Sequence, residues 1–230
     1  MSNDDNKTIK AENCTDIQVQ EIIAEFKECL NEKNHRYLSF DYCYYYFQTN
    51  GSCLTDSDHM EKSCMMLWSF LSSWGMLRKS KLMQYNYSAL KPVIEIIQKY
   101  LGSKKDIPDV KEESEKEDSK EYCEKVVRLY NDISDSIKVK YFKPTDTLVT
   151  KIILGVFGAF PALDRNFRKV FGQGKIETIA DKVWNFYKDH KDVLKEKIPV
   201  QNFNGVTDLE YPAAKLIDMF GFTAGMKIKP

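Results

Sequence analysis

Common signatures of metal and cofactor sites are missing from this sequence of 230 residues. It has three histidines, none with a histidine or carboxylate at a recognised ligand spacing, and its six cysteines form no CxxC pair. It also lacks a GxSxG elbow, a P-loop and a dinucleotide-binding glycine pattern. We therefore expect no metal and no cofactor, and whether the chain is an enzyme stays open at this stage.

An excess of charge and long apolar runs are missing as well. The chain has 34 basic and 34 acidic residues, so no field of the whole molecule demands a nucleic acid or a membrane as partner. Its apolar runs are interrupted too early to span a bilayer, and the polar start "MSNDDNKTIKAEN" lacks the apolar core of a signal peptide. The expected location is the cytoplasm, with reduced thiols and no membrane partner.

The sequence does contain the material for a sizeable helical core. Hydrophobic residues make up 43% of it and aromatic residues 13%. Apolar positions recur with the helical period in most segments, and no pair of long alternating runs demands a sheet. Thr15 and Gln18 form a capping-box pattern where the first helix begins. We predict an all-α fold of about eight or nine helices, as one compact domain or two closely packed halves.

Composition suggests where those halves meet. Residues 1–14 are polar and are expected to be a disordered tail. Residues 103–121, "SKKDIPDVKEESEKEDSKE", are almost devoid of apolar side chains and are expected to be a charged linker. The predicted organisation is thus an N-terminal helical half over 15–102 and a C-terminal helical half over 122–230.

One segment of this neutral chain is locally basic. Residues 138–175 contain eight basic residues and only two acidic ones, Asp146 and Asp164, which leaves an excess of six positive charges. Such a segment is typical of a surface that contacts nucleic acid, although lysines can also simply solvate helix surfaces. The residues expected to contact nucleic acid are Lys143, Arg165, Arg168 and Lys169, with Arg78 and Lys79 from the basic end of an earlier helix.

The same segment contains "LGVFGAFPALDRNF", whose glycines allow close packing or a helix end before Pro161. A helix, a glycine-containing turn, the short "PALD" and a basic, aromatic helix start together resemble the helix-hairpin-helix DNA glycosylases, although their "LPGVG" hairpin is absent. The resemblance implies that Asp164 is the essential carboxylate facing a flipped nucleotide. It further implies that Lys151, or else Lys143, is the reacting amine.

A second resemblance spans most of the chain. The stretches "SFDYCYYYF", "WSFLSSWGMLRKS" and "TLVTKIILGVFGAFPALDRNF" are similar to a family of uncharacterised bacterial proteins. This resemblance implies a bacterial, cytosolic, all-helical protein and brings no activity with it.

Two functions therefore stay open. The first is a nucleic-acid-binding or DNA-processing, glycosylase-like domain that uses Asp164, Lys151 and the basic segment. The second is a non-enzymatic helical interaction module whose aromatic and methionine-rich surfaces dock a protein partner or a second copy. In the second case Asp164 stabilises a helix N-terminus, and Arg165 is a salt-bridge partner at the surface.

Overall fold

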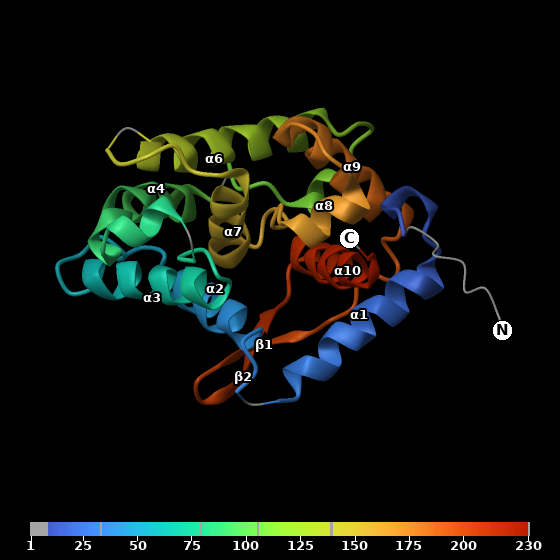
Figure 1. Ribbon diagram of the computed structural model, residues 1–230, viewed down its shortest axis with the longest axis horizontal. Helices are drawn as coiled ribbons and strands as arrows, with labels where there is room; N and C mark the ends of the chain where they lie inside the picture. The colour runs from blue at the N-terminus through green and yellow to red at the C-terminus, as the bar shows by residue number, and fades with distance from the viewer. Residues whose placement is uncertain (1–8, 33, 79, 105, 139, 230) are drawn as a thin grey trace.

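The computed structural model describes residues 9–32, 34–78, 80–104, 106–138 and 140–229. The described residues form ten α-helices, three short 3-10 turns and a small two-stranded hairpin (Figure 1), which confirms a mostly helical, compact fold. In chain order the elements are η1 (Ala11–Asn13), α1 (Asp16–Leu30), α2 (Leu38–Asn50), α3 (Met60–Ser73), η2 (Lys81–Gln84), η3 (Tyr87–Leu90), α4 (Lys91–Ser103), α5 (Val110–Glu113), α6 (Lys120–Lys138), α7 (Asp146–Phe157), α8 (Arg165–Phe171), α9 (Ile176–Asp189), β1 (Pro199–Asn202), β2 (Gly205–Glu210) and α10 (Ala213–Lys227).

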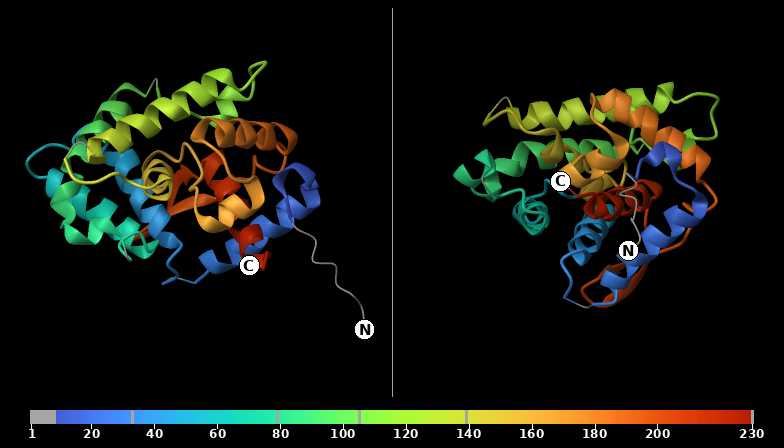
Figure 2. Two further views of the ribbon diagram at one scale, coloured as in Figure 1. Left: turned by 45° about the horizontal axis from the view of Figure 1, so that its top comes forward. Right: turned by 45° about the vertical axis from the view of Figure 1, so that its right-hand side comes forward.

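Helix α10 lies at the centre of the fold and is buried from Ala213 to Gly225. It contacts α1 on one side and α8 and α9 on the other (Figure 1). Helices α1 and α10 come from opposite ends of the chain and lie side by side in all three views (Figure 2). Beyond α10, α2 packs on α3, α7 and β1, while α6 packs across α4, α7 and α9.

The two halves of the sequence share one apolar core. Contacts of α1 with α10, α2 with α7 and α4 with α6 join them. The expected linker contains α5, in which Val110 and Glu113 are buried. Trp184 donates its indole N–H to the Glu113 carbonyl at 3.2 Å, and the Glu113 carboxylate pairs with Lys125. The charged segment is thus anchored to α6 and α9 through α5, whereas most of its other described residues are exposed.

The expected N-terminal tail lies partly outside the described residues, which begin at residue 9. From there Ala11 is buried, and Lys10 donates its ammonium to the Lys169 carbonyl at 3.2 Å. The capping box of Thr15 and Gln18 is present at the start of α1, as predicted.

The hairpin of β1 and β2 was not predicted. Its strands are antiparallel, and Asn202 pairs with Gly205 across a two-residue loop of Phe203 and Asn204. Gly205 has a φ of 131°, a conformation that favours glycine. Asn204 followed by Gly205 is a common hairpin signal, but the strands are short and mostly exposed, so the alternating apolar pattern is weak.

Two glycines of α10 allow α8 to pack closely against it. A Cβ atom on Gly225 would lie 2.0 Å from the carbonyl oxygen of Asn166. A Cβ atom on Gly221 would lie 2.4 Å from the ring of Phe167. The backbone of Asn166 cannot move aside as a flexible side chain can. The close contact therefore requires a residue without a side chain at position 225.

We expect Gly225→Ala to lower the free energy of unfolding by about 1–3 kcal/mol, because the methyl group overpacks the contact between α8 and α10. The matched control is Gly102→Ala in α4, where a Cβ would meet nothing within 4 Å. The control should be neutral or stabilising by up to about 1 kcal/mol, since alanine is the better helix former. Urea unfolding of the three proteins measures both effects, and equal stability of the two variants would contradict the packing argument.

Candidate functional site

Among the described residues, five charged side chains lie together inside the fold, and we call them the buried charge cluster. Asp41 comes from α2, Lys151 from α7, Asp164 from the start of α8, and Lys215 and Asp218 from α10. Lys215 is 0% exposed, Asp41 1%, Lys151 4% and Asp218 5%. Charged side chains are seldom buried this deeply unless they are paired.

Ion pairs and hydrogen bonds compensate these charges. The Lys151 ammonium lies 3.6 Å from an Asp164 carboxylate oxygen, and the Lys215 ammonium lies 3.3 Å from an Asp218 oxygen. The other Asp218 oxygen accepts the Ala162 N–H at 3.0 Å. Asp41 accepts the Tyr211 hydroxyl and, at 2.8 Å, the N–H of Gln201 in β1.

Asp164 is both a helix cap and an ion-pair partner. Its Oδ1 accepts the N–H groups of Asn166 and Phe167, each at 3.0 Å, at the start of α8. Its Oδ2 faces Lys151, and 18% of the side chain is exposed. The predicted role at a helix N-terminus is therefore confirmed, and the same carboxylate lies beside Lys151, one of the two candidate amines that the glycosylase resemblance implied.

Aromatic rings surround the two amines. The Lys151 ammonium lies 4.5 Å from the centre of the Trp74 ring. The Lys215 ammonium lies 4.8 Å from the Phe26 ring and 4.7 Å from the Phe40 ring. Both amines line a cavity too narrow to hold a water molecule. The aromatic faces thus offer cation–π attraction in place of hydration.

This dry environment shifts the pKa values of the cluster. Burial lowers the pKa of Lys215, although Asp218 and Asp41 oppose that change. Burial also raises the pKa of Asp218, and it raises the pKa of Asp41 to about 6. The cluster therefore combines an amine that loses its proton at lower pH than usual with two carboxyls that lose theirs at higher pH than usual. Such shifted groups are frequent where protons are transferred.

A cleft of about 530 Å³ adjoins the cluster. The α1–α2 connection, α2, α3 and the hairpin tip form it, with the lining residues Asn34, His35, Arg36, Leu38, Ser39, Tyr42, Met65, Met66, Ser69, Phe70, Ser73 and Phe203. Phe70 lines both the cleft and the narrow cavity. The guanidinium of Arg36, in the cleft, lies 5.7 Å from the same Trp74 ring that contacts Lys151. Trp74 therefore lies at the boundary between the cleft and the buried amines.

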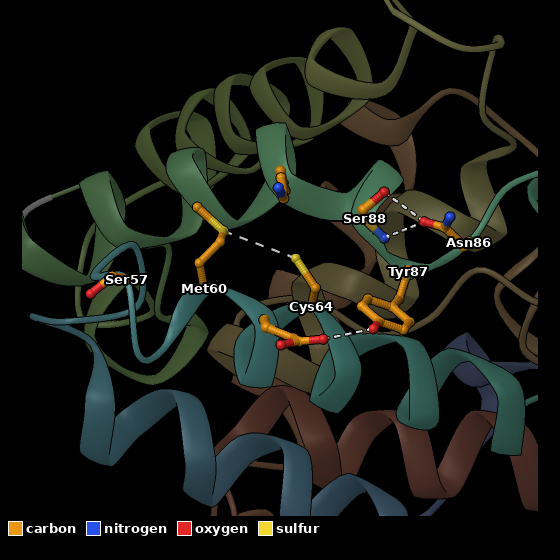
Figure 3. A pocket seen from close by; sticks show the side chains of 8 residues that line it. Ser57, Met60, Cys64, Asn86, Tyr87 and Ser88 are labelled. Carbon is orange, nitrogen blue, oxygen red and sulfur yellow. Dashed lines mark hydrogen bonds between the residues drawn. The ribbon is translucent and has the colours of Figure 1, made fainter.

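A second pocket, of about 460 Å³, lies between α3 and the α4 start (Figure 3). Its wall is held by a 2.7 Å hydrogen bond from the Tyr87 hydroxyl to Glu61 and a 2.6 Å hydrogen bond from Ser88 to Asn86. Burial raises the pKa of the Cys64 thiol to about 11, so this thiol stays protonated at neutral pH and is a poor nucleophile. The buried charge cluster is the better candidate for chemistry.

The residues expected to contact nucleic acid differ in their exposure and in their contacts within the chain. Arg78, Lys143 and Arg165 are exposed, whereas Lys79 lies outside the described residues. Arg168 pairs with Asp146 at 2.8 Å. Lys169 donates to the carbonyls of Gly225 and Ile228 at the end of α10. Arg168 and Lys169 are thus engaged in contacts within the chain, and Lys151 is buried.

Sequence reasoning missed three members of the cluster, Asp41, Lys215 and Asp218. A signal was present in "AAKLIDMFGF", where a lysine and an aspartate stand three residues apart in an otherwise apolar helix. Asp41 carries a weaker signal, as the one acid in the aromatic stretch "SFDYCYYYF".

Comparison with known proteins adds no relative. No protein-family model, curated protein or solved structure matches the chain. Within the described residues, every helix is too short or too polar to cross a membrane. The geometry of the buried charge cluster is therefore the basis on which a function can be proposed.

The raised pKa of Asp41 should make the protein less stable as the pH rises. In the unfolded chain this carboxyl ionises near 3.8, whereas in the folded chain it keeps its proton up to about pH 6. Between these values the folded state binds more protons, so the free energy of unfolding falls with pH, by about 3 kcal/mol in total. Asp41→Asn should lack this contribution.

Urea unfolding between about pH 4 and pH 7 tests this expectation. The stability of Asp41→Asn relative to the unmodified chain should increase over that range. Asp208→Asn, which changes an exposed carboxylate of β2, is the control and should stay parallel to the unmodified chain. Parallel pH profiles for Asp41→Asn and the unmodified chain would show that Asp41 is ionised throughout.

The two roles of Asp164 can be separated by substitution. Asp164→Asn retains a capping oxygen but removes the charge beside Lys151, whereas Asp164→Ala removes both. We expect both variants to be less stable than the unmodified chain, and the alanine variant to lose about 1 kcal/mol more. Thermal and urea unfolding give the two losses, and equal losses would show that the cap contributes nothing.

Proposed function

We propose that the chain processes nucleic acid by glycosylase-like chemistry, with Lys151 as the attacking amine and Asp164 as the carboxylate that accepts its proton. The observation that carries this proposal is the pairing of these two groups at 3.6 Å, with Lys151 lining a narrow cavity among aromatic rings. The resemblance of "PALDRNF" to helix-hairpin-helix glycosylases supports the same assignment and suggests a nucleotide as the substrate.

The chemistry requires an unprotonated amine. Transfer of the ammonium proton to Asp164 would leave the nitrogen of Lys151 free to bond to C1′ of an extruded nucleotide. The bond between C1′ and the base would break at the same carbon, and its electron pair would leave with the base, which takes up the proton held by Asp164. The nitrogen of Lys151 would then lose a second proton to Asp164. The ring oxygen O4′ would take up that proton as the C1′–O4′ bond breaks, which gives a protonated Schiff base between Lys151 and C1′.

Lys151, rather than Lys215, is the amine that a substrate would reach. Lys215 is fully buried on α10 and pairs with Asp218. The side chain of Asp164, beside Lys151, is 18% exposed, so this pair lies on the solvent side of the cluster. Behind this pair, Lys215 and Asp218 would balance each other's charge. Trp74 would have to move to admit a sugar, because the cavity beside Lys151 is too narrow to hold even a water molecule.

The cleft has groups suited to a nucleotide. Arg36 offers a guanidinium for a phosphate, and Tyr42 offers a ring on which a base can stack. Phe203, at the hairpin tip, is 92% exposed and would fill the gap that an extruded base leaves in a duplex. Exposed Arg78, Lys143 and Arg165 are available to the phosphate backbone.

The alternative function is a non-enzymatic interaction module. Phe203 and Met65 both line the cleft and are 92% and 49% exposed, which suits an apolar contact with a protein partner or a second copy. In that case the buried charge cluster would serve only to specify the packing of α2, α7 and α10.

Borohydride trapping distinguishes the two functions. Duplexes that contain an abasic site or one of a panel of damaged bases are incubated with the protein and sodium borohydride, which reduces a Schiff base to a stable amine. We expect a covalent adduct whose formation slows at least about 100-fold in Lys151→Gln and Asp164→Asn. Lys175→Gln, an exposed lysine of the basic segment, should react like the unmodified chain.

Exposed amines also react slowly with abasic sites, so the comparison of Lys151→Gln with Lys175→Gln is the criterion. Circular dichroism confirms that each variant is folded. Equal adduct from both variants would exclude Lys151 as the nucleophile. Absence of an adduct, together with absence of salt-dependent DNA binding, would favour the interaction module.

A further inference from the structure

In the described chain, three side chains of metal-ligating type meet in the connection between α2 and α3. Cys53, Asp56 and His59 each offer a ligand atom, and these atoms all lie within 4.8 Å of one another. Cys53 and His59 are half-buried, whereas Asp56 is exposed. We call these residues the thiol–imidazole cluster. It is distinct from the buried charge cluster and does not depend on the function proposed for it.

The backbone of this connection explains why the three side chains meet. The N–H of Cys53 donates to Asn50 at 3.0 Å, that of Asp56 to Cys53 at 3.1 Å, and that of His59 to Asp56 at 3.0 Å. Each bond closes a turn between residues three positions apart, as in a 3-10 helix, where side chains at that spacing lie on the same side. The spacing CxxDxxH therefore brings the ligands together here, although it is not a recognised ligand spacing on an α-helix.

The connection is anchored to the rest of the fold. Leu54 is fully buried, and the Ser63 hydroxyl donates to its carbonyl at 3.2 Å. The N–H of Thr55 donates to the Gln98 side chain of α4 at 2.7 Å. The ligand atoms are thus held near one another by contacts that do not require an ion. Most of the conformational entropy that ordering the site costs is therefore lost on folding and not on metal binding.

An independent observation also points to a missing ligand. The Nδ1 atom of His59 is buried and has no hydrogen-bond partner among the described residues. A buried polar atom without a partner costs free energy and is uncommon in native structures. Coordination of a metal ion through Nδ1 would supply that partner.

We propose that Cys53, Asp56 and His59 bind a zinc ion. A thiolate, a carboxylate and a neutral imidazole carry two negative charges, which balance Zn²⁺, and the sulfur ligand disfavours Mg²⁺ and Ca²⁺. Zinc–ligand bonds of about 2.0–2.3 Å place tetrahedral ligand atoms about 3.5 Å apart. Small side-chain rotations from the observed separations reach that geometry. The fourth position is left to water.

Zinc at this site would cross-link the connection between the end of α2 at Asn50 and the start of α3 at Met60. The opposite ends of these helices carry Asp41 and Phe70, which belong to the buried charge cluster and its cavity. The thiol of Cys53 donates to the Asn50 carbonyl at 3.4 Å and would give up this proton on binding.

Cobalt substitution tests the proposal. The full-length chain is freed of metal with a chelator, kept reduced with a phosphine, and titrated with Co²⁺ and then Zn²⁺. We expect one ion per chain, a thiolate-to-cobalt charge-transfer band, and displacement of Co²⁺ by Zn²⁺. Cys53→Ser should abolish the charge-transfer band, and His59→Gln and Asp56→Asn should each weaken zinc binding by at least about 10-fold.

Two matched controls keep the test specific. Asp58→Asn changes an exposed carboxylate two residues from Asp56, and Cys14→Ser changes a half-buried thiol of another segment. Both should bind like the unmodified chain, and circular dichroism verifies the fold of every variant. The proposal is overturned if the unmodified chain binds no stoichiometric zinc. It is overturned equally if Cys53→Ser keeps the band, or if either control loses as much affinity as the ligand variants.

Discussion

The ion pair of Lys215 and Asp218 inside the core is the interaction on which the rest of the structure depends. Both residues lie on the central helix α10, where charges cannot be hydrated, so each neighbouring element must supply a compensating group. The segment before α8 supplies the Ala162 N–H to Asp218, α2 supplies Asp41, and α1 supplies the face of Phe26 to Lys215. The positions of α1, α2 and α8 around α10 are therefore tied to this pair.

Deep burial of charge is seldom a source of stability. Apolar side chains of similar volume often stabilise a core equally well or better. Burial raises the pKa of Asp41 to about 6 and lowers the pKa of Lys215, and both shifts carry a free-energy cost for the folded chain. This free-energy cost is explained if Lys151 and Asp164 perform chemistry. It then links the stability of the buried charge cluster to its proposed function.

Helices α2 and α3 connect the two candidate sites. Their adjacent ends carry the thiol–imidazole cluster, whereas their other ends border the cleft and the narrow cavity. Trp74 follows directly after α3 and contacts both Lys151 and Arg36 through its ring. A change in the position of α3 would therefore move Trp74, at the boundary between the cleft and the buried amines, without involving α10.

The sequence by itself determined most of the helices and two of their caps, because apolar periodicity and capping chemistry depend on residues a few positions apart. It correctly indicated the capping box at Thr15 and the place of Asp164 at a helix start. Only the tertiary structure decided the buried charge cluster, since Asp41 and Gln201 are 160 positions apart and Ala162 and Asp218 are 56 apart. The sequence also did not predict the hairpin or the thiol–imidazole cluster, because short exposed strands and consecutive turns have no periodic pattern of apolar residues. Local patterns specify elements, whereas long-range packing decides which charges lose their water and become chemically distinctive.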